Sequence, residues 1–401
     1  MDHQIDLVVM QSTPFCNIAC KYCYLPDRSS TQKMSLTTLR NVFSRVFESG
    51  WVRDRFTVVW HAGEPMTLGP AYYDAAFSLI ESLRPRDIAI QHSFQTNGTL
   101  INQEWCDFIR RTGLKIGVSI DGPQPIHDKF RVLRDGKGSF QRTMQGINLL
   151  RQNGIDFSVI AVLTKCSLLA PDQLYDFFAG HNIERLSFNV EEIEGVNRTS
   201  SITPDDAYDL YWNFLNYFWE RLLAERKRIS QREFEEAFAC IVRPDASSML
   251  NSQTTPFRML NVDVRGNFST FSPEFLGQSD PRYGNFCFGN LNNVTLESAL
   301  SNPIYLKLNE DIQRGVDKCR AECQYFSVCG GGAPVNKLNE NGSLATSETL
   351  FCRLTKMVPI DLALALLEND VNLRADDQRE NADAPGMMRA PDPAQLAGSE
   401  A

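Results

Sequence analysis

The sequence predicts an α/β fold in which a mostly parallel sheet curls into a full or partial barrel, followed by a small cysteine-rich C-terminal domain. The first half of the 401-residue chain alternates short β-branched apolar runs with amphipathic stretches, which is the pattern of repeated βα units. The segment 257–351 is instead rich in glycine, asparagine and cysteine. About six βα units fit a partial (β/α)6, TIM-like barrel, whose chemistry lies at the carboxyl ends of the strands.

Hydrophobic periodicity places the individual elements. Six apolar runs are expected as strands, at 5–10, 56–60, 88–94, 115–119, 157–163 and 185–190. Amphipathic stretches between them are expected as helices, at 35–48, 71–83, 103–111, 139–152 and 171–180. The region 204–238 is expected to be helical, 257–351 to contain short elements only, and 358–367 to form a last helix.

The chain divides into four expected parts: a barrel at 1–200, a helical bridge at 201–255, a cysteine-rich domain with its closing helix at 256–371, and a disordered tail at 372–401. A first strand at residue 5 leaves no room for a separate N-terminal recognition domain. The many aromatic residues of 204–219 fit either a helix packed on the barrel or a wall for a substrate. Helix packing is the favoured interpretation.

Composition narrows the class of protein. A net charge of −9 does not supply the basic face that nucleic acids and anionic membrane surfaces require, so neither is expected as a partner. No apolar run of about 18 residues exists, and the polar N-terminus is not a signal peptide, so a cytoplasmic protein is expected. Eleven cysteines, an odd number in a reducing compartment, favour metal binding over disulfides.

Three cysteines, Cys16, Cys20 and Cys23, directly follow the first expected strand. Three thiolates on one loop can hold one metal site, and they leave one corner of a cubane iron–sulfur cluster open for a further ligand. A structural zinc site would need a fourth ligand, and the loop contains no other cysteine or histidine. The spacing therefore favours an open, catalytic iron–sulfur site over zinc.

Short polar motifs follow the next three expected strands. They read HAGEP at 61–65, QTNG at 95–98 and SIDGP at 119–123, and HDKFR at 127–131 comes soon after. Together with the C-x3-C-x2-C spacing of the cysteines, they resemble the signature of the radical S-adenosylmethionine (SAM) superfamily. In that signature the motif that corresponds to HAGEP contains Gly-Gly-Glu-Pro. This chain has Ala62 in place of the first of those glycines.

The resemblance implies SAM and a catalytic 4Fe–4S cluster as cofactors, with Cys16, Cys20 and Cys23 as cluster ligands. The reduced cluster would cleave SAM to a 5′-deoxyadenosyl radical, which removes a hydrogen atom from an unactivated carbon. The missing side chain of Gly63 allows close approach of the backbone, and the fork of Arg131 suits a carboxylate. The expected SAM contacts are Tyr22, Gly63, Glu64, Asn97, Ser119, Asp121 and Arg131.

A second cysteine set, Cys319, Cys323, Cys329 and Cys352, lies near the C-terminus. It resembles the SPASM extension of peptide-modifying radical SAM enzymes, which binds two auxiliary clusters. Here the set is complete for the farther cluster only. The resemblance thus implies one fully ligated auxiliary 4Fe–4S cluster, so that the chain carries two clusters in all. A four-cysteine zinc site is the alternative.

The ligands of the nearer auxiliary cluster are missing. Ala333 stands in place of one cysteine, no cysteine flanks Gly266, and Phe271 occupies the position five residues after that glycine. Cys287 fits neither cysteine set. The three remaining cysteines lie in or near expected helices and strands and are interpreted as small core residues.

Over nearly the whole of 5–370, the chain resembles the cyclophane-forming SPASM maturases, the group that includes GrrM and OscB. This implies cross-linking of an aromatic ring carbon to the β-carbon of a nearby residue in a ribosomally synthesised precursor peptide. The peptide would dock on the barrel rim or the cysteine-rich domain, near 204–219. An external one-electron reductant of flavodoxin or ferredoxin type would supply the electrons.

Two alternatives remain open. A sulfatase-maturase-like oxidase that forms formylglycine shares the segment 119–131, but it keeps both auxiliary clusters. It also places a general-base aspartate where this chain reads FSPE at 271–274, which makes Glu274 the candidate catalytic base. The third possibility, a non-catalytic iron–sulfur sensor, is disfavoured because a sensor has no need for an open iron site.

Overall fold

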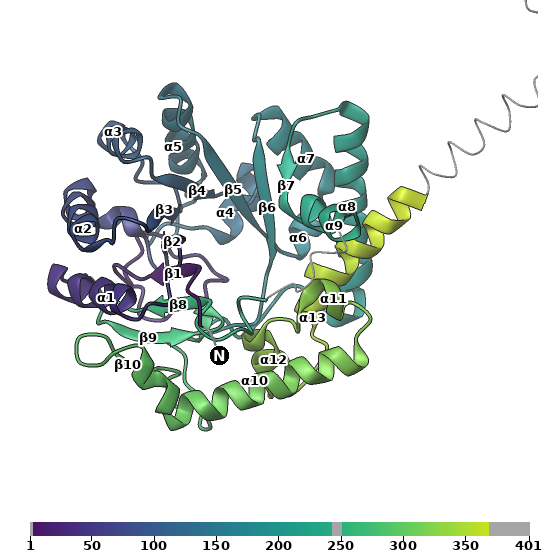
Figure 1. Ribbon diagram of the computed structural model, residues 1–401. Coiled ribbons are helices and arrows are strands. Elements are labelled where there is room, and N and C mark those ends of the chain that lie inside the picture. Colours follow the sequence, from purple (N-terminus) through teal and green to yellow (C-terminus); the bar gives the residue numbers. More distant parts are fainter. Residues whose placement is uncertain (1–2, 243–250, 369–401) are drawn as a thin grey trace, which may run out of the picture.

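A computed structural model describes residues 3–242 and 251–368 of the chain. Its centre is a ten-stranded sheet with the order β10-β9-β8-β1-β2-β3-β4-β5-β6-β7 (Figure 1). The six expected strands are all present and pair in parallel along the chain. They are β1 (Leu7–Met10), β2 (Arg55–Trp60), β3 (Ala89–Thr96), β4 (Lys115–Ser119), β5 (Phe157–Leu163) and β6 (Arg185–Val190).

Helices between these strands cover the outer face of the curved sheet (Figure 1). Their amphipathic pattern and their caps explain where they begin. Ser35 accepts a hydrogen bond from Thr38 N–H at the start of the first helix, and Asn102 accepts one from Trp105 N–H at the start of the third. The helices between the six strands are α1 (Leu36–Glu48), α2 (Pro70–Leu83), α3 (Gln103–Thr112), α4 (Gln124–Phe130), α5 (Phe140–Gln152), α6 (Lys165–Leu168) and α7 (Pro171–Gly180), and α8 (Pro204–Glu225) follows β6.

The cysteine-rich segment continues the barrel sheet instead of forming a sheet of its own. After β7 (Ser230–Gln231) and α9 (Arg232–Val242), strand β8 (Met259–Val262) pairs in parallel with β1. The short strand β9 (Asn267–Thr270) then pairs antiparallel with β8, and β10 (Gly289–Asn290) pairs antiparallel with β9. Backbone hydrogen bonds therefore tie the C-terminal segment to the first barrel strand. The four-part division of the chain stays a prediction.

The expectation that 257–351 holds short elements only is wrong. Helix α10 (Pro303–Glu322) has 20 residues. It begins at Asn302, whose side chain accepts hydrogen bonds from two backbone N–H groups. The buried residues Tyr305, Leu308, Ile312 and Val316 recur at helical spacing along one face, so the signal was present in the sequence.

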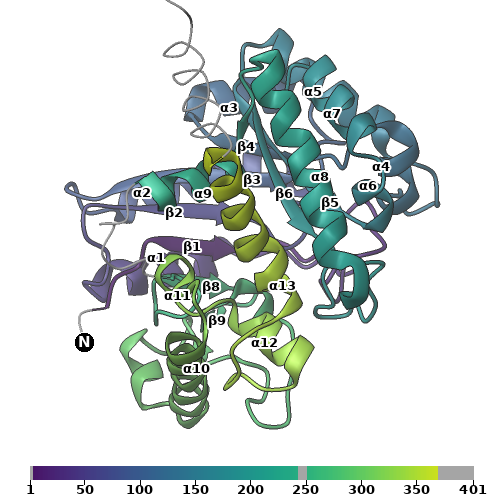
Figure 2. The ribbon, with the colours of Figure 1, turned by 90° about the vertical axis from the view of Figure 1, so that its right-hand side faces the viewer.

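Short helices complete the C-terminal segment: α11 (Phe326–Cys329), α12 (Pro334–Asn341) and α13 (Leu350–Cys352). The chain stays helical to residue 368, with a π-helical turn at Arg353–Met357, which confirms the helix expected at 358–367. Figure 2 shows this last helical segment, in yellow, beside α8 and α9. The expected disordered tail, 372–401, lies outside the described residues.

Helix α8 packs against the barrel, as the favoured interpretation predicts. Tyr211, Phe214, Phe218 and Trp219 are buried in the core, whereas Tyr208 is 37% exposed. Most of its aromatic side chains therefore stabilise the fold and form no open wall.

Within 3–242 and 251–368, none of the helices combines the length and apolar character that a bilayer-spanning segment requires.

Candidate active site

The first three cysteines lie on the long loop between β1 and α1. A hydrogen bond of 2.7 Å from Ala19 N–H to Val132 O holds this loop against the segment after α4. Cys20 is buried, and Cys16 and Cys23 are partly buried. Burial raises the pKa of Cys16 to about 11 and that of Cys20 to about 12. These thiols therefore keep their protons at neutral pH unless a metal displaces them.

Three of the expected SAM contacts form one buried polar cluster beside this loop. Asp121, after β4, accepts a hydrogen bond of 2.5 Å from the Tyr22 hydroxyl and pairs with the Arg131 guanidinium at 3.0 Å. The side chain of Asp121 is 1% exposed and that of Arg131 is 8% exposed. Nη1 of Arg131 also lies 3.9 Å from Sγ of Cys20, within N–H···S distance. These polar side chains therefore place the positive charge of Arg131 next to Cys20, a predicted ligand of the iron–sulfur cluster.

The buried carboxylate of Glu64 joins the ends of β2 and β3. It accepts hydrogen bonds from Met66 N–H at 3.1 Å, from the Thr96 hydroxyl at 2.7 Å and from Asn97 N–H at 2.8 Å. Burial raises the pKa of Glu64 to about 7, and the three donors act in the opposite direction. In this structure Glu64 fixes the backbone of two predicted SAM loops.

Gly63 occupies a position that only glycine fits. A Cβ at this residue would lie 2.0 Å from the carbonyl oxygen of Thr13, and its φ is 141°. Ala62 has a φ of 63°, in the left-handed region, which costs a residue with a side chain about 1 kcal/mol. The Gln11 side chain holds this turn by donating to Ala62 O at 2.8 Å. Ala62 therefore forms the same left-handed turn that a glycine would form there, at the cost of some backbone strain.

Asn97 connects the third strand with the cysteine loop. Its Nδ2 donates to Oδ1 of Asn17 at 2.8 Å and lies 3.8 Å from Sγ of Cys16. Ser119, at the end of β4, accepts a hydrogen bond of 2.8 Å from the Gln95 side chain. The structure thus gathers the predicted SAM contacts at one end of the parallel sheet. Their contact with SAM stays a prediction.

The four C-terminal cysteines line one small cavity. Cys319 lies in the last turn of α10 and Cys323 directly follows that helix, whereas Cys329 ends α11 and Cys352 ends α13. Gly332 N–H donates to Sγ of Cys329 at 3.1 Å. Contacts of this kind orient thiolate ligands and tune the potential of an iron–sulfur cluster.

A buried lysine adjoins this cavity. Lys337 is 2% exposed, and its Nζ donates to Sγ of Cys319 at 3.2 Å and to Gly315 O at 2.9 Å. Burial raises the pKa of Cys319, and the charge of Lys337 acts in the opposite direction. A buried ammonium is costly unless a negative charge balances it. Four thiolates would provide that balance.

The three thiols of the first cysteine loop fit an iron–sulfur cluster with one open position. The four C-terminal thiols fit a fully ligated cluster. In the part of the chain that the structure describes, no group of three or more histidine, cysteine, aspartate or glutamate side chains is arranged to hold a single metal ion. A 4Fe–4S cubane binds each thiolate through a different iron, so its ligands need not converge on one point. Metal analysis decides between a cluster and zinc.

Apolar residues occupy two positions where a nearer auxiliary cluster would need cysteines. Phe271 is completely buried, with its ring centroid 6.4 Å from that of Tyr305, and Ala333 is 5% exposed. Cys287, partly buried, does not line the cavity of the four cysteines, and burial raises its pKa to about 12. These positions contribute to packing.

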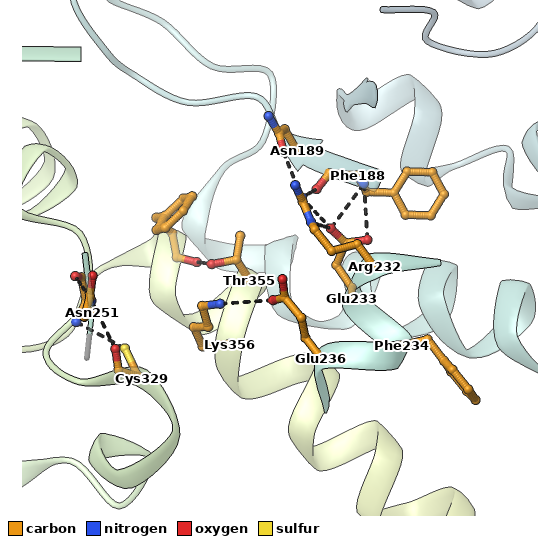
Figure 3. A network of polar contacts seen from close by, with 12 residues as sticks. Phe188, Asn189, Arg232, Glu233, Phe234, Glu236, Asn251, Cys329, Thr355 and Lys356 are labelled. Carbon is orange, nitrogen blue, oxygen red and sulfur yellow. Dashed lines mark hydrogen bonds and ion pairs between the residues drawn. The ribbon is translucent and has the colours of Figure 1, made fainter. Parts of the chain in front are cut away.

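A cavity of about 590 Å³ lies between the barrel and the C-terminal segment. Its wall includes Asn189 at the end of β6, Glu194 after that strand, and Glu274 in the single-turn helix η2 (Pro273–Phe275). The predicted auxiliary ligands Cys329 and Cys352 also line it. Figure 3 shows part of this wall, with α9 on one side and Cys329 on the other. The volume is that of a ligand pocket.

The loop after β6 brings this cavity close to the first cysteine loop. Val196 N–H donates to Tyr24 O at 3.0 Å, and a Cβ on Gly195 would lie 2.2 Å from the same oxygen. Tyr24 directly follows Cys23, and Glu194 directly precedes Gly195. One wall residue of the cavity, Glu194, thus belongs to a loop that contacts the first cysteine loop, and two others, Cys329 and Cys352, belong to the second cysteine set.

Two carboxylates join Glu274 in this cavity, and sequence analysis missed both. Burial raises the pKa of Glu274 to about 7 and that of Glu192 to about 8, and it raises that of Glu194 well above its usual value. Glu192 and Glu194 directly follow the last expected barrel strand. Their position at the carboxyl end of a strand was the signal that could have identified them.

Comparison with known proteins identifies the family. The profile of the Radical SAM superfamily matches residues 10–193. An uncharacterized protein of Synechocystis sp., sll1766, is 40% identical over 92% of this chain and 93% of its own length. A serine-type anaerobic sulfatase-maturating enzyme of Bacteroides thetaiotaomicron is 35% identical over 84% of each chain.

Solved structures share the fold. Native anSMEcpe with bound AdoMet (SAM) superimposes with a TM-score of 0.74 and 21% identity, over 92% of this chain and 99% of its own. Streptococcus suis SuiB bound to the precursor peptide SuiA superimposes with a TM-score of 0.60 and 16% identity, over 88% of this chain and 76% of its own. The chain belongs to the radical SAM superfamily, and its cofactors are SAM and a 4Fe–4S cluster. The predicted superfamily and fold class are confirmed.

Proposed function

We propose that the protein is a peptide maturase that joins an aromatic ring carbon to the β-carbon of a nearby residue in a ribosomally synthesised precursor peptide. The cavity of about 590 Å³ carries this proposal. It is large enough for peptide side chains. Its wall includes Glu194, on a loop that contacts the first cysteine loop, and Cys329 and Cys352 of the second cysteine set. A substrate in this cavity would lie between the open cluster and the auxiliary cluster.

The relatives support a peptide substrate. The SuiB structure contains the precursor peptide SuiA, and anSMEcpe has been solved with a Cp18Cys peptide. Buried Phe271 and Ala333 support a single auxiliary cluster, which is the reduced set of the cyclophane-forming group. The partners proposed for this cytoplasmic reaction are the precursor peptide and a flavodoxin- or ferredoxin-type reductant.

The chain's own residues position the reaction. SAM and the clusters, when bound, supply radical chemistry and accept an electron. Cys16, Cys20 and Cys23 would hold the open cluster, and the four C-terminal cysteines the auxiliary one. Formation of a carbon–carbon bond removes two hydrogens from the peptide, one of them as a proton. Glu274 lines the cavity with a pKa raised to about 7, which suits a group that accepts a proton near neutral pH.

Replacing Glu274 by glutamine should separate the two halves of this reaction. SAM cleavage should continue, because Glu274 lies outside the predicted SAM contacts. Peptide product should fall by about 10²-fold or more, because no base takes the proton. Deoxyadenosine and product are measured in the same anaerobic reaction. Glu274→Asp should recover part of the product, and an unchanged product yield in Glu274→Gln would exclude the residue as the base.

Replacing Lys337 by methionine should lower the midpoint potential of the auxiliary cluster, by an amount on the order of tens of millivolts. A nearby positive charge favours the reduced, more negative cluster, so its removal favours the oxidised form. Redox titration followed by electron paramagnetic resonance measures the potential. Lys318, exposed on α10 beside Cys319, provides the control variant Lys318→Met, whose potential should match that of the wild type because water screens its charge.

The product distinguishes the proposal from its alternative. A candidate precursor peptide is incubated anaerobically with the reconstituted enzyme, SAM and dithionite, and the product is analysed by tandem mass spectrometry. A cross-link removes two hydrogens and suppresses fragmentation between the joined residues. Formylglycine instead reacts with a hydrazide probe and leaves fragmentation intact. Absence of deoxyadenosine under all conditions would favour a non-catalytic iron–sulfur sensor.

A further inference from the structure

The described wall of the large cavity contains more acidic than basic side chains. Among its described residues, five are glutamates and two are cations, Arg232 and Lys356. Both cations are already engaged (Figure 3). Arg232 pairs with Glu233 at 2.5 Å and also donates to backbone and side-chain oxygens of β6, and Lys356 pairs with Glu236 at 3.5 Å. Both of these glutamates belong to α9.

The other three glutamates of the wall have no such partner. Among the ion pairs of residues 3–242 and 251–368, none includes Glu192, Glu194 or Glu274. Glu192 accepts one hydrogen bond, of 2.5 Å, from the neutral amide of Asn336. Glu194 is buried, and Glu192 and Glu274 are half-buried. Desolvation raises the pKa of Glu192 and Glu194, and the negative charge of Glu274 raises both further. The region thus combines three carboxyl groups for whose ionised forms the described residues of the wall provide no free cation.

Glu194 provides the observation that points to a ligand. Its side chain lines the cavity and the residue is only 7% exposed, yet its Oε1 has no hydrogen-bond partner in the structure. Buried polar atoms are rarely left unpaired, and an unpaired one in a native protein signals a missing partner. The loop that carries Glu194 is tied to the first cysteine loop by the hydrogen bond of 3.0 Å from Val196 N–H to Tyr24 O. The carboxylate therefore faces the cavity with one oxygen unpaired.

We infer that this cavity binds a cationic side chain, lysine or arginine, of the peptide substrate, with Glu194 and Glu192 as its carboxylate partners. The inference rests on the proposed function, because it names a property of the same peptide. A side chain is favoured over a bare metal ion, since no described group of carboxylates is arranged to hold one ion. A guanidinium or ammonium donates several hydrogen bonds and can satisfy both carboxylates together. Such a contact would position the neighbouring residue of the peptide between the two cluster sites.

A pair of peptides that differ in one charge tests the inference without turnover. The probes are fluorescein-labelled Gly-Gly-Trp-X-Gly-Gly peptides in which X is arginine, lysine or citrulline, the neutral isostere of arginine. Their dissociation constants for the reconstituted full chain are measured by fluorescence anisotropy. The wild type should bind at least one cationic peptide about tenfold or more tightly than the citrulline peptide. Glu194→Gln should abolish most of this difference.

Glu236→Gln is the matched control, because it removes a charge from the same wall at a glutamate that already has a cation. It should keep the preference for the cationic peptide. Iron content and thermal midpoint of each variant show that it has folded. Equal affinity of wild type for all three peptides, absence of binding, or an unchanged preference in Glu194→Gln would overturn the inference. Tighter binding in the presence of added Mg²⁺ or Ca²⁺ alone would instead identify a metal site. Failure of the proposed function appears separately, as absence of deoxyadenosine or of cross-linked product.

Discussion

Replacing Cys16, Cys20 and Cys23 together by alanine should abolish SAM cleavage and remove about four of about eight iron atoms per chain. The expected loss is complete because the open cluster has no other ligands on its loop, and without it no electron reaches SAM. The auxiliary site should retain its iron, since its four cysteines lie on separate C-terminal elements. Iron and sulfide are counted after anaerobic purification, and deoxyadenosine is measured after addition of dithionite and SAM.

The chain offers a control with the same number of lost thiols. Cys106, Cys166 and Cys240 belong to neither set, and their combined replacement by alanine should leave both iron content and deoxyadenosine unchanged. Zinc in the protein, with all iron lost in the variant of the first set, would make the C-terminal site a structural zinc site. Loss of all iron without zinc would mean that the second set holds no independent cluster.

The barrel half of the fold could be predicted because its signals are local. Each strand from β1 to β6 is a short apolar run, and the helices between them show one buried face. The C-terminal strands β8 to β10 could not be found in this way, since they have only two to four residues, and β8 pairs with the distant strand β1. Helix α10 was missed for a different reason, because glycine, asparagine and cysteine around it concealed a regular apolar face.

The candidate site likewise has a part that the sequence identified and a part that only the structure shows. Cysteine spacing and the motif after each strand identified the first loop, and the structure places those motifs at one end of the sheet. The large cavity escaped prediction because it forms where Glu194, Glu274 and Cys329 meet from three separate parts of the chain. Lys337 escaped for a similar reason, because only the packing of α12 against α10 shows that it is buried. A single lysine in a sequence is normally a surface residue.

Replacing Arg131 by methionine should lower the free energy of unfolding of the cluster-free chain by about 3–5 kcal/mol. The variant leaves Asp121, which is 1% exposed, as a buried carboxylate without its counter-charge. The remaining donors, the Tyr22 hydroxyl and Val162 N–H, provide hydrogen bonds but no charge. Urea unfolding in the absence of SAM and iron measures this cost separately from any loss of cofactor binding.

Two further variants show whether charge burial is the cause. Asp121→Asn combined with Arg131→Met should recover part of the lost stability, because the double variant buries no unpaired charge while an amide oxygen still accepts from Tyr22. Arg111→Met removes an arginine from an exposed pair with Asp74, at 2.7 Å, and should cost less than about 1 kcal/mol. If Arg131→Met is no more destabilising than Arg111→Met, the buried pair contributes no more to folding than an exposed one. The charge of Arg131 beside Cys20 would then serve SAM or the iron–sulfur cluster and not stability.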